Sequence, residues 1–127
     1  MIRIQHKEDG QGVYTRSRNS SDFVWDILQQ FSFGRKHPTA SEDSELADEL
    51  RGSGFSPDML MGFRYGFENE SQMREWFYCD SFFEAAHKEG FELVHVEGKI
   101  FYGETQCVVL ADTMRIVKRE SLERFFK

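Results

Sequence analysis

The stretch "FELVHVEGKIFYGETQCVVLADTMRIVK", residues 91–118, decides the fold. Apolar β-branched and aromatic residues dominate it, and turn residues interrupt it at short intervals, which is typical of strands joined by tight turns. The pattern predicts four strands, near residues 91–97, 99–102, 105–111 and 114–118. Turns are expected at Glu97-Gly98 and Ala111-Asp112-Thr113. The four strands are expected to follow one another as a β meander.

The N-terminus carries a second extended pattern. In "MIRIQH", Ile2 and Ile4 alternate with Arg3 and Gln5, the period of a half-buried strand. Asp9-Gly10 and a second glycine at position 12 predict a hairpin turn, after which "VYTRS" resumes the extended pattern. No helical pattern follows the glycines, which disfavours a phosphate-cradling loop.

Helical patterns occupy the middle of the chain. They end at glycines and begin at capping residues, such as the Thr39/Glu42 pair, Ser56 before Pro57, and the Asn69/Gln72 pair. In the third of these, Met73, Trp76 and Phe77 share one face and are expected in the core. The predicted helical segments are 20–31, a short one carrying Leu46, Ala47 and Leu50, one or two turns from Ser56, one after Asn69, and one from Ser81 to Gly90.

The order of these elements predicts an α+β fold. A final helical turn in "ESLERFF", residues 120–126, should return Leu122, Phe125 and Phe126 to the core. Strands and helices do not alternate as βαβ units, so we expect a mainly antiparallel sheet. It would consist of the N-terminal hairpin plus the C-terminal meander, with helices packed on one face. At this length the whole chain, 1–127, is expected to form one domain.

Composition excludes several classes of function. The formal net charge is −6, which argues against strong nucleic-acid binding. No apolar run reaches the length of a membrane span, so no membrane association and a cytoplasmic location are expected. Cys79 and Cys107 show no metal-ligand or disulfide spacing and are expected to be buried thiols. Thirteen phenylalanines indicate either an aromatic core or a patch for a partner.

No pattern of catalytic or metal-binding residues stands out. A nucleophilic enzyme needs a Ser or Cys near a His and an orienting acid, and no such motif is present. The four histidines are dispersed without ligand spacing, so neither a metal nor a cofactor is expected.

A cluster of cations flanks the first predicted helix and is the strongest candidate for ligand binding. Arginine forms bidentate hydrogen bonds with phosphate or carboxylate, and the flanking loops are where binding residues concentrate. An aromatic side chain could stack on a base. The two ends of that helix are expected to lie about 18 Å apart, so either each end acts alone as a weak surface cluster, or a homodimer brings the two ends together. For a nucleotide ligand the dimer is favoured. The candidate ligand-binding residues are Tyr14, Arg16, Arg18, Arg35, His37 and Tyr65.

Short motifs spread along the chain carry a family resemblance. "GQGVY" at 10–14, "HP" at 37–38, "YGF" at 65–67, "WF" at 76–77, "GFEL" at 90–93 and the Gln of "GETQ" at 103–106 resemble a family of small tailed-phage accessory proteins. The resemblance implies a phage origin, a location in the host cytoplasm and no known active site. Small accessory phage proteins often act on host proteins or on host defence.

Three hypotheses of function remain open. The first is a non-enzymatic phage accessory protein that antagonises a host factor or defence system, by binding a host protein or by sequestering a small nucleotide signal. The second is an NAD-dependent ADP-ribosyltransferase-like enzyme, because His6, Tyr14 and Gln106 follow one another in a similar order. The acidic partner expected close after the glutamine of such enzymes is absent, since Cys107 and Val108 follow Gln106. The third is a virion assembly factor.

Overall fold

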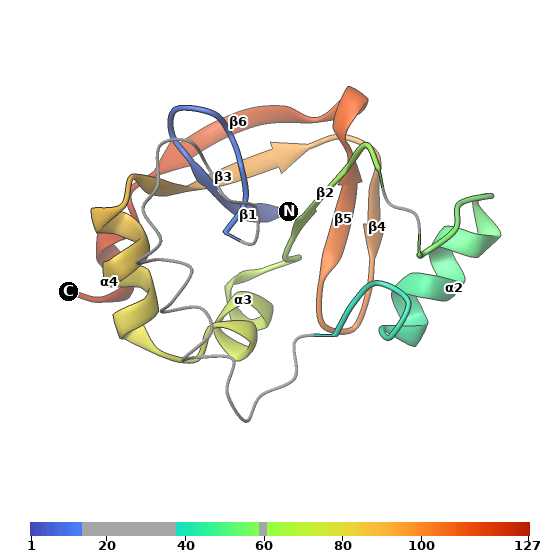
Figure 1. The fold of residues 1–127 in the computed structure, drawn as a ribbon, viewed down its shortest axis with the longest axis horizontal. Coiled ribbons are helices and arrows are strands. Elements are labelled where there is room, and N and C mark those ends of the chain that lie inside the picture. Colours follow the sequence, from blue (N-terminus) through green and yellow to red (C-terminus); the bar gives the residue numbers. More distant parts are fainter. Residues whose placement is uncertain (14–37, 59–60) are drawn as a thin grey trace.

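Two antiparallel three-stranded sheets and three helices make up the described structure (Figure 1). The computed structural model describes residues 1–13, 38–58 and 61–127. The first sheet has the order β1-β3-β6 and the second the order β2-β5-β4. In chain order the elements are β1 (Ile2–His6), α2 (Ser44–Gly52), β2 (Phe63–Gly66), α3 (Glu70–Trp76), α4 (Asp80–Lys88), β3 (Phe91–Glu97), β4 (Ile100–Tyr102), β5 (Cys107–Leu110), the 3-10 turn η1 (Ala111–Thr113), β6 (Arg115–Glu120) and the 3-10 turn η2 (Leu122–Phe125).

The first sheet carries the larger hydrophobic core. One face of β1 and β3 packs against α3, α4 and η2; α4 and the C-terminus lie at one end of the molecule, and α3 lies nearer its middle (Figure 1). The aromatic rings are in mutual contact: Phe77 stacks on Phe82 with centroids 4.0 Å apart, and Phe83 stacks on Phe125 at 5.1 Å. All described phenylalanines are buried or partly buried, so in this part of the chain they form core.

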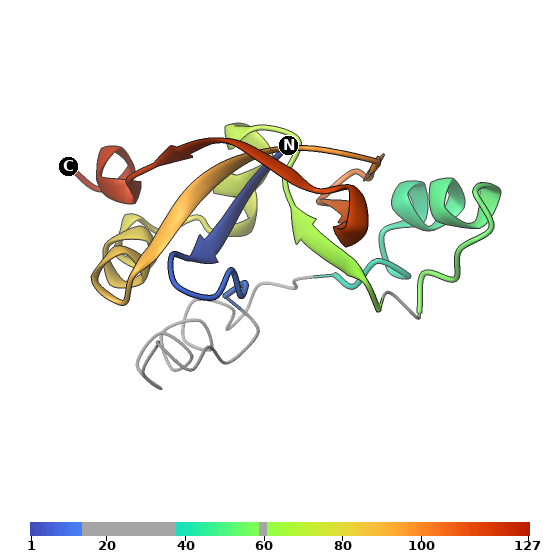
Figure 2. The ribbon, with the colours of Figure 1, turned by 90° about the horizontal axis from the view of Figure 1, so that it is seen from above.

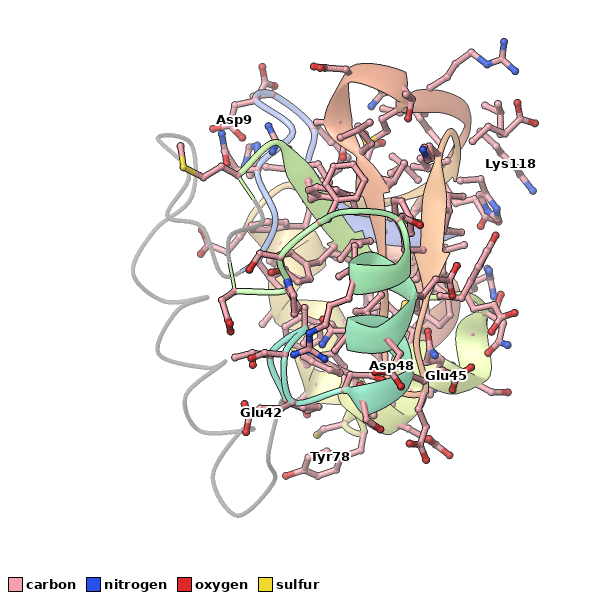
Figure 3. All side chains as sticks on the ribbon, turned by 90° about the vertical axis from the view of Figure 1, so that its right-hand side faces the viewer. Asp9, Glu42, Glu45, Asp48, Tyr78 and Lys118 are labelled. Atoms are coloured by element: carbon pink, nitrogen blue, oxygen red, sulfur yellow. The ribbon has the colours of Figure 1, made fainter. Side chains whose placement is uncertain are left out.

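The second sheet packs against α2 at the opposite end (Figure 2). Leu46 and Leu50 of α2 meet Phe63, Phe101 and Val108 of the sheet. The polar side of α2 faces solvent, with Glu45 and Asp48 on its outer surface (Figure 3). Asp43 caps the helix by accepting a hydrogen bond from the Leu46 N–H, and its carboxylate also accepts the N–H groups of Glu104 and Thr105. This one side chain therefore fixes α2 to the β4–β5 loop.

In the described part of the chain, a backbone bridge joins the two sheets. Ile2 of β1 and Phe67, just after β2, exchange two N–H···O bonds of 2.8 Å each. A third cluster of buried residues, Val94, Val96 and Val109, fills the space where β5 packs over β3. Because Val94 and Val96 need cover on the face away from α4, the β4–β5 hairpin folds over β3 instead of extending its sheet.

This packing corrects the predicted topology. The α+β class and the antiparallel pairing are confirmed, but the meander is wrong, because β4 and β5 leave the first sheet and β6 returns to pair with β3. The helices lie on two sheets, and the expected single helical layer is not observed. A tight turn follows β1, with the His6 N–H bonded to the Gln11 carbonyl at 2.9 Å, whereas β1 itself pairs with β3. The predicted continuation of the hairpin beyond Val13 lies outside the described residues.

Helices were predicted more accurately where the capping residues lie close together in the sequence. Asn69 accepts the Gln72 N–H at 2.9 Å, and α3 and α4 begin within two residues of their predicted starts. Three expectations are wrong. The cap of α2 is Asp43 and not Thr39, residues 56–58 form a turn and not a helix, and the strand β2 was not predicted. The segment 20–31 is outside the described part of the chain.

Buried positions in α3 and at its C-cap, Phe77, follow the spacing of helical turns. Met73 and Phe77 are four residues apart and point into the core, with 0% and 4% of their surfaces exposed. Trp76 lies beside that stripe and is only partly buried against it. The expectation of a core position is therefore confirmed for Phe77 and holds only in part for Trp76. Among the described residues no helix has the length and apolarity to cross a membrane.

Candidate functional site

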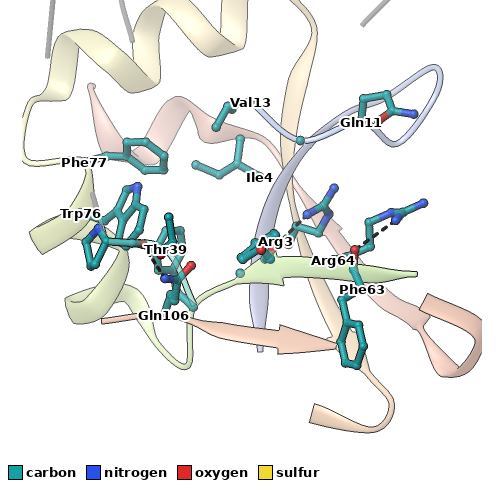
Figure 4. Close-up of a pocket in the computed structure, with 15 residues that line it drawn as sticks. Arg3, Ile4, Gln11, Val13, Thr39, Phe63, Arg64, Trp76, Phe77 and Gln106 are labelled. Atoms are coloured by element: carbon teal, nitrogen blue, oxygen red, sulfur yellow. Dashed lines mark hydrogen bonds between the residues drawn. The ribbon is translucent and has the colours of Figure 1, made fainter. Parts of the chain in front are cut away.

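A cleft opens between β1 and β2, along the edge of β1 that does not pair with β3 and the edge of β2 that does not pair with β5. Its volume is about 420 Å³, within the range of small-molecule sites. Arg3 and Arg64 lie toward one end of it and Trp76, Phe77 and Gln106 toward the other (Figure 4). The described residues that line it are Arg3, Ile4, Gln11, Gly12, Val13, Pro38, Thr39, Phe63, Arg64, Tyr65, Gly66, Phe67, Trp76, Phe77 and Gln106.

The cleft exists because β1 and β2 touch at one point and then diverge. They meet at the Ile2–Phe67 bridge, where the chains come so close that a Cβ on Gly66 would lie 2.4 Å from the Ile2 carbonyl oxygen. Glycine at position 66 is therefore required by the close approach. Beyond the bridge the two strands separate, and side chains from both occupy the space between them.

Arg3 is the most unusual side chain of the cleft. Its residue is 5% exposed, although arginine is rarely buried without a counter-ion. The guanidinium donates to Gln5 Oε1 at 3.1 Å, to the Tyr65 carbonyl at 2.8 Å and to the Gly10 carbonyl at 3.2 Å. All three acceptors are neutral. Within the described residues, no carboxylate pairs with Arg3.

Arg64 adds a second positive charge on the same side. Its guanidinium donates to its neighbour's carbonyl, Phe63 O, at 3.1 Å, and it too has no carboxylate partner in the described ranges. Burial, and then the charge of Arg64, lower the pKa of Arg3 from 12.5 to about 10. Arg3 nevertheless remains protonated at neutral pH. This end of the cleft is thus positively charged and rich in hydrogen-bond donors.

The backbone of β2 adds donors at the same place. Gly62 accepts the Ala111 N–H at 2.7 Å, and in the same register Arg64 pairs with Val109. Because bonding alternates along an antiparallel strand, the N–H and C=O groups of Phe63 and Tyr65 point away from β5, toward the cleft. The two carbonyls are already engaged by Arg64 and Arg3. The N–H groups of these two residues are directed toward the same edge, which pairs with no strand at these positions among the described residues.

The other end of the cleft is apolar and aromatic. Ile4, Val13 and Phe67 belong to the main core and reach the cleft wall, and Trp76 packs on Phe67 with ring centroids 5.7 Å apart. Polar side chains at this end include Thr39 and Gln106 (Figure 4); Gln106 is 3% exposed, and its Nε2 donates to the Pro38 carbonyl at 2.7 Å. The cleft therefore has a cationic end and an aromatic end.

Most of the residues predicted to bind a ligand cannot be placed. Tyr14, Arg16, Arg18, Arg35 and His37 lie outside the described residues. Tyr65 is described, 44% exposed on β2, and it lines the cleft. The dimer expected from the arginine loops depends on the undescribed residues and stays a prediction.

Sequence reasoning missed Arg3 and Arg64. In "MIRIQH" the alternation places Arg3 on the face opposite Ile2 and Ile4, which predicts a solvent-facing charge. In the fold the turn after β1 and the edge of β2 cover that second face, and every residue of β1 is buried. A signal was present in Arg64, which stands between the aromatic residues Phe63 and Tyr65 in an alternating run.

The residues of the enzyme hypothesis have structural partners. The His6 ring accepts the Glu8 N–H through Nδ1, so Nε2 carries the proton and donates to the Glu89 carbonyl at 2.9 Å. His6 is not among the described residues that line the cleft, whereas Gln106 is. Cys107 is fully buried, and burial raises the pKa of its thiol to about 12. In the described part of the chain, no group of three His, Cys, Asp or Glu side chains is arranged to hold a metal ion.

Comparison with known proteins places the chain in a phage family. No curated protein and no solved structure gives a match. A family model described as bacteriophage T4 Y00F protein matches residues 1–123, nearly the whole chain and including every residue of the cleft. The chain therefore belongs to the bacteriophage T4 Y00F protein family.

Proposed function

We propose that this phage protein is an accessory protein that acts by binding, and that the cleft between β1 and β2 holds a small anionic ligand. The observation that carries the proposal is the pair Arg3 and Arg64, which face the cleft without a carboxylate partner among the described residues. Family membership supports the phage role, and the cleft supports binding.

Burying the charged guanidinium of Arg3 is energetically unfavourable. Removing a guanidinium from water costs several kcal/mol, which neutral carbonyl acceptors offset only in part. Arg64 adds repulsion, and the lowered pKa of Arg3 reflects both effects. An arrangement that is unfavourable in the free protein and points into a cleft is characteristic of functional sites. A bound anion would compensate both charges.

The chemistry of the donors favours phosphate or carboxylate. Arginine presents planar, bidentate donors, and the Phe63 and Tyr65 N–H groups lie along the same edge. In the host cell such a ligand would be a small anionic metabolite or signal, and its sequestration would antagonise the process that uses it. Binding through these donors is sufficient for this role, and no catalytic turnover is required. The bonds that hold His6 and Gln106 are consistent with structural duties.

Calorimetric titration with pyrophosphate at low ionic strength tests the proposal. We expect saturable binding at one site per chain, and at least a tenfold loss of affinity in Arg64→Gln, because charge-assisted hydrogen bonds contribute about 1.5–3 kcal/mol. The matched control is Arg115→Gln, which removes an exposed arginine of β6 far from the cleft lining. Absence of binding, or equal loss in the two variants, would overturn the proposal.

A further inference from the structure

We infer that the ligand of the cleft is a nucleotide, with its phosphate at Arg3 and Arg64 and its base at the aromatic end. This inference rests on the proposed function and specifies the ligand class. It follows from the division of the cleft into two chemically different ends, which a simple inorganic anion would use only in part.

The cleft is larger than an inorganic anion requires. A water molecule occupies about 30 Å³ of liquid, so a cavity of about 420 Å³ far exceeds what an inorganic phosphate needs. The lining also includes the apolar side chains of Ile4, Val13 and Phe67, which gain nothing from contact with an inorganic ion. A ligand that fills the cleft therefore carries an apolar or aromatic body beside its anionic group.

Aromatic rings form part of the wall at the end of the cleft opposite Arg3 and Arg64. Trp76, Phe77 and Phe67 contribute rings to its wall, and planar bases stack on such side chains independently of sequence. An aliphatic body would use the same volume without the ring-on-ring contact. The aromatic lining thus favours a planar group over a fatty chain.

The side-chain amide of Gln106 lies at the same end of the cleft. Gln106 is the buried amide there, and within the described residues its side chain is bonded to the Pro38 carbonyl. That bond uses one of the two Nε2 protons, and an amide also has the acceptor Oε1. A donor and an acceptor on one planar group match the edge of a base. A hydrocarbon body would leave these groups unsatisfied.

A comparison of ligands separates this inference from the proposed function. We expect the preferred member of the four nucleoside 5′-monophosphates to bind at least tenfold more tightly than ribose 5-phosphate. Trp76 should report the event, because quenching of its fluorescence in a Trp25→Phe background reflects a base at the aromatic end. Trp76→Phe should keep most of the preference, whereas Trp76→Leu should reduce it and leave the affinity for pyrophosphate unchanged. Tyr78→Leu, outside the lining of the cleft, is the matched control.

The opposite result is equally clear. If ribose 5-phosphate binds as tightly as all four nucleotides while Arg64→Gln weakens every ligand, the cleft binds anions without recognising a base. The nucleotide inference then fails and the proposed function stands. If no phosphate compound binds in an Arg64-dependent way, both fail.

Discussion

The guanidinium of Arg3 donates to the Tyr65 carbonyl at 2.8 Å, at the point where a continuing β1–β2 ladder would place the N–H of Ile4. Ile2 and Phe67 form a hydrogen-bonded pair, and the next such pair along the register would be Ile4 and Tyr65. A side chain thus replaces a backbone bond. The strands separate as a result, and the cleft between them is lined by the group that separates them.

Arg3→Met is expected to destabilise the protein even though it removes a buried charge. Methionine fills similar volume but leaves the carbonyls of Tyr65 and Gly10 without their donor, and each buried unsatisfied group costs about 1–3 kcal/mol. Urea unfolding should show a net loss of about 1–3 kcal/mol, because relief from the charge offsets part of the cost. Arg115→Met, on the exposed part of β6, should change stability by less than about 0.5 kcal/mol. Equal midpoints for wild type and Arg3→Met would contradict the bonding described for Arg3.

Gly66→Ala tests the bridge between the two sheets. An added Cβ would lie 2.4 Å from the Ile2 carbonyl oxygen, which belongs to backbone and cannot swing aside. We expect a loss of about 1–3 kcal/mol in the free energy of unfolding, the usual cost of overpacking. Gly52→Ala is the control, because a Cβ at that position meets nothing within 4 Å. A variant at position 66 as stable as the one at position 52 would mean that the sheets do not meet at Ile2 and Phe67.

The sequence was sufficient for elements whose signals are local. The Asn69–Gln72 cap and the spacing from Met73 to Phe77, the C-cap residue of α3, are local signals, so the helix and its buried side could be predicted. The strand β2 has only four residues, one of them glycine, and its pairing partner, β5, is far along the chain. Nothing near Phe63 in the sequence reveals that partner.

The burial of Arg3 in the candidate site could not be predicted from the sequence for a related reason. Arg3 becomes buried only because Tyr65 and Gly10 approach it from other segments, and the alternation of β1 alone predicts an exposed charge. Pairing of β3 with β6 likewise depends on how Val94 and Val96 pack against Val109. Both features are decided by contacts between distant segments. The periodicity of a single segment contains no information about them.

Asp43→Ala should detach α2 from the β4–β5 loop. Burial alone would raise the pKa of Asp43, but hydrogen bonds from Thr105, Leu46 and Glu104 outweigh it and lower the pKa, so the charged carboxylate is the form that the fold uses. Loss of the cap costs about 1 kcal/mol, and the N–H groups of the loop that lose their acceptor raise the loss in free energy of unfolding to about 2–4 kcal/mol. Chemical unfolding monitored by circular dichroism measures this free energy.

Two further variants sharpen the Asp43 prediction. Asp43→Asn keeps one acceptor oxygen and should give an intermediate loss, whereas Asp58→Ala removes an exposed carboxylate and should have almost no effect. If Asp43→Asn were as stable as wild type, the second carboxylate oxygen, which accepts the Thr105 N–H and hydroxyl, would not contribute.

Glu120→Gln should make the stability of the folded protein less sensitive to a fall of the pH into the acidic range. The hydrogen bond with His95, 2.7 Å between Nε2 and Oε2, lowers the pKa of Glu120; burial opposes this and Arg124 reinforces it, leaving a value of about 2 instead of 4.5. Because the folded-state pKa is the lower one, the carboxylate stabilises the fold above pH 4.5, and this contribution disappears as the pH falls from 4.5 toward 2. The difference in melting temperature between wild type and Glu120→Gln should therefore be largest above pH 5 and shrink steadily below it. Glu49→Gln, an exposed change on α2, should give a small difference at every pH. A difference for Glu120→Gln that stayed constant from pH 7 to pH 3 would show that the His95–Glu120 pair does not stabilise the folded state.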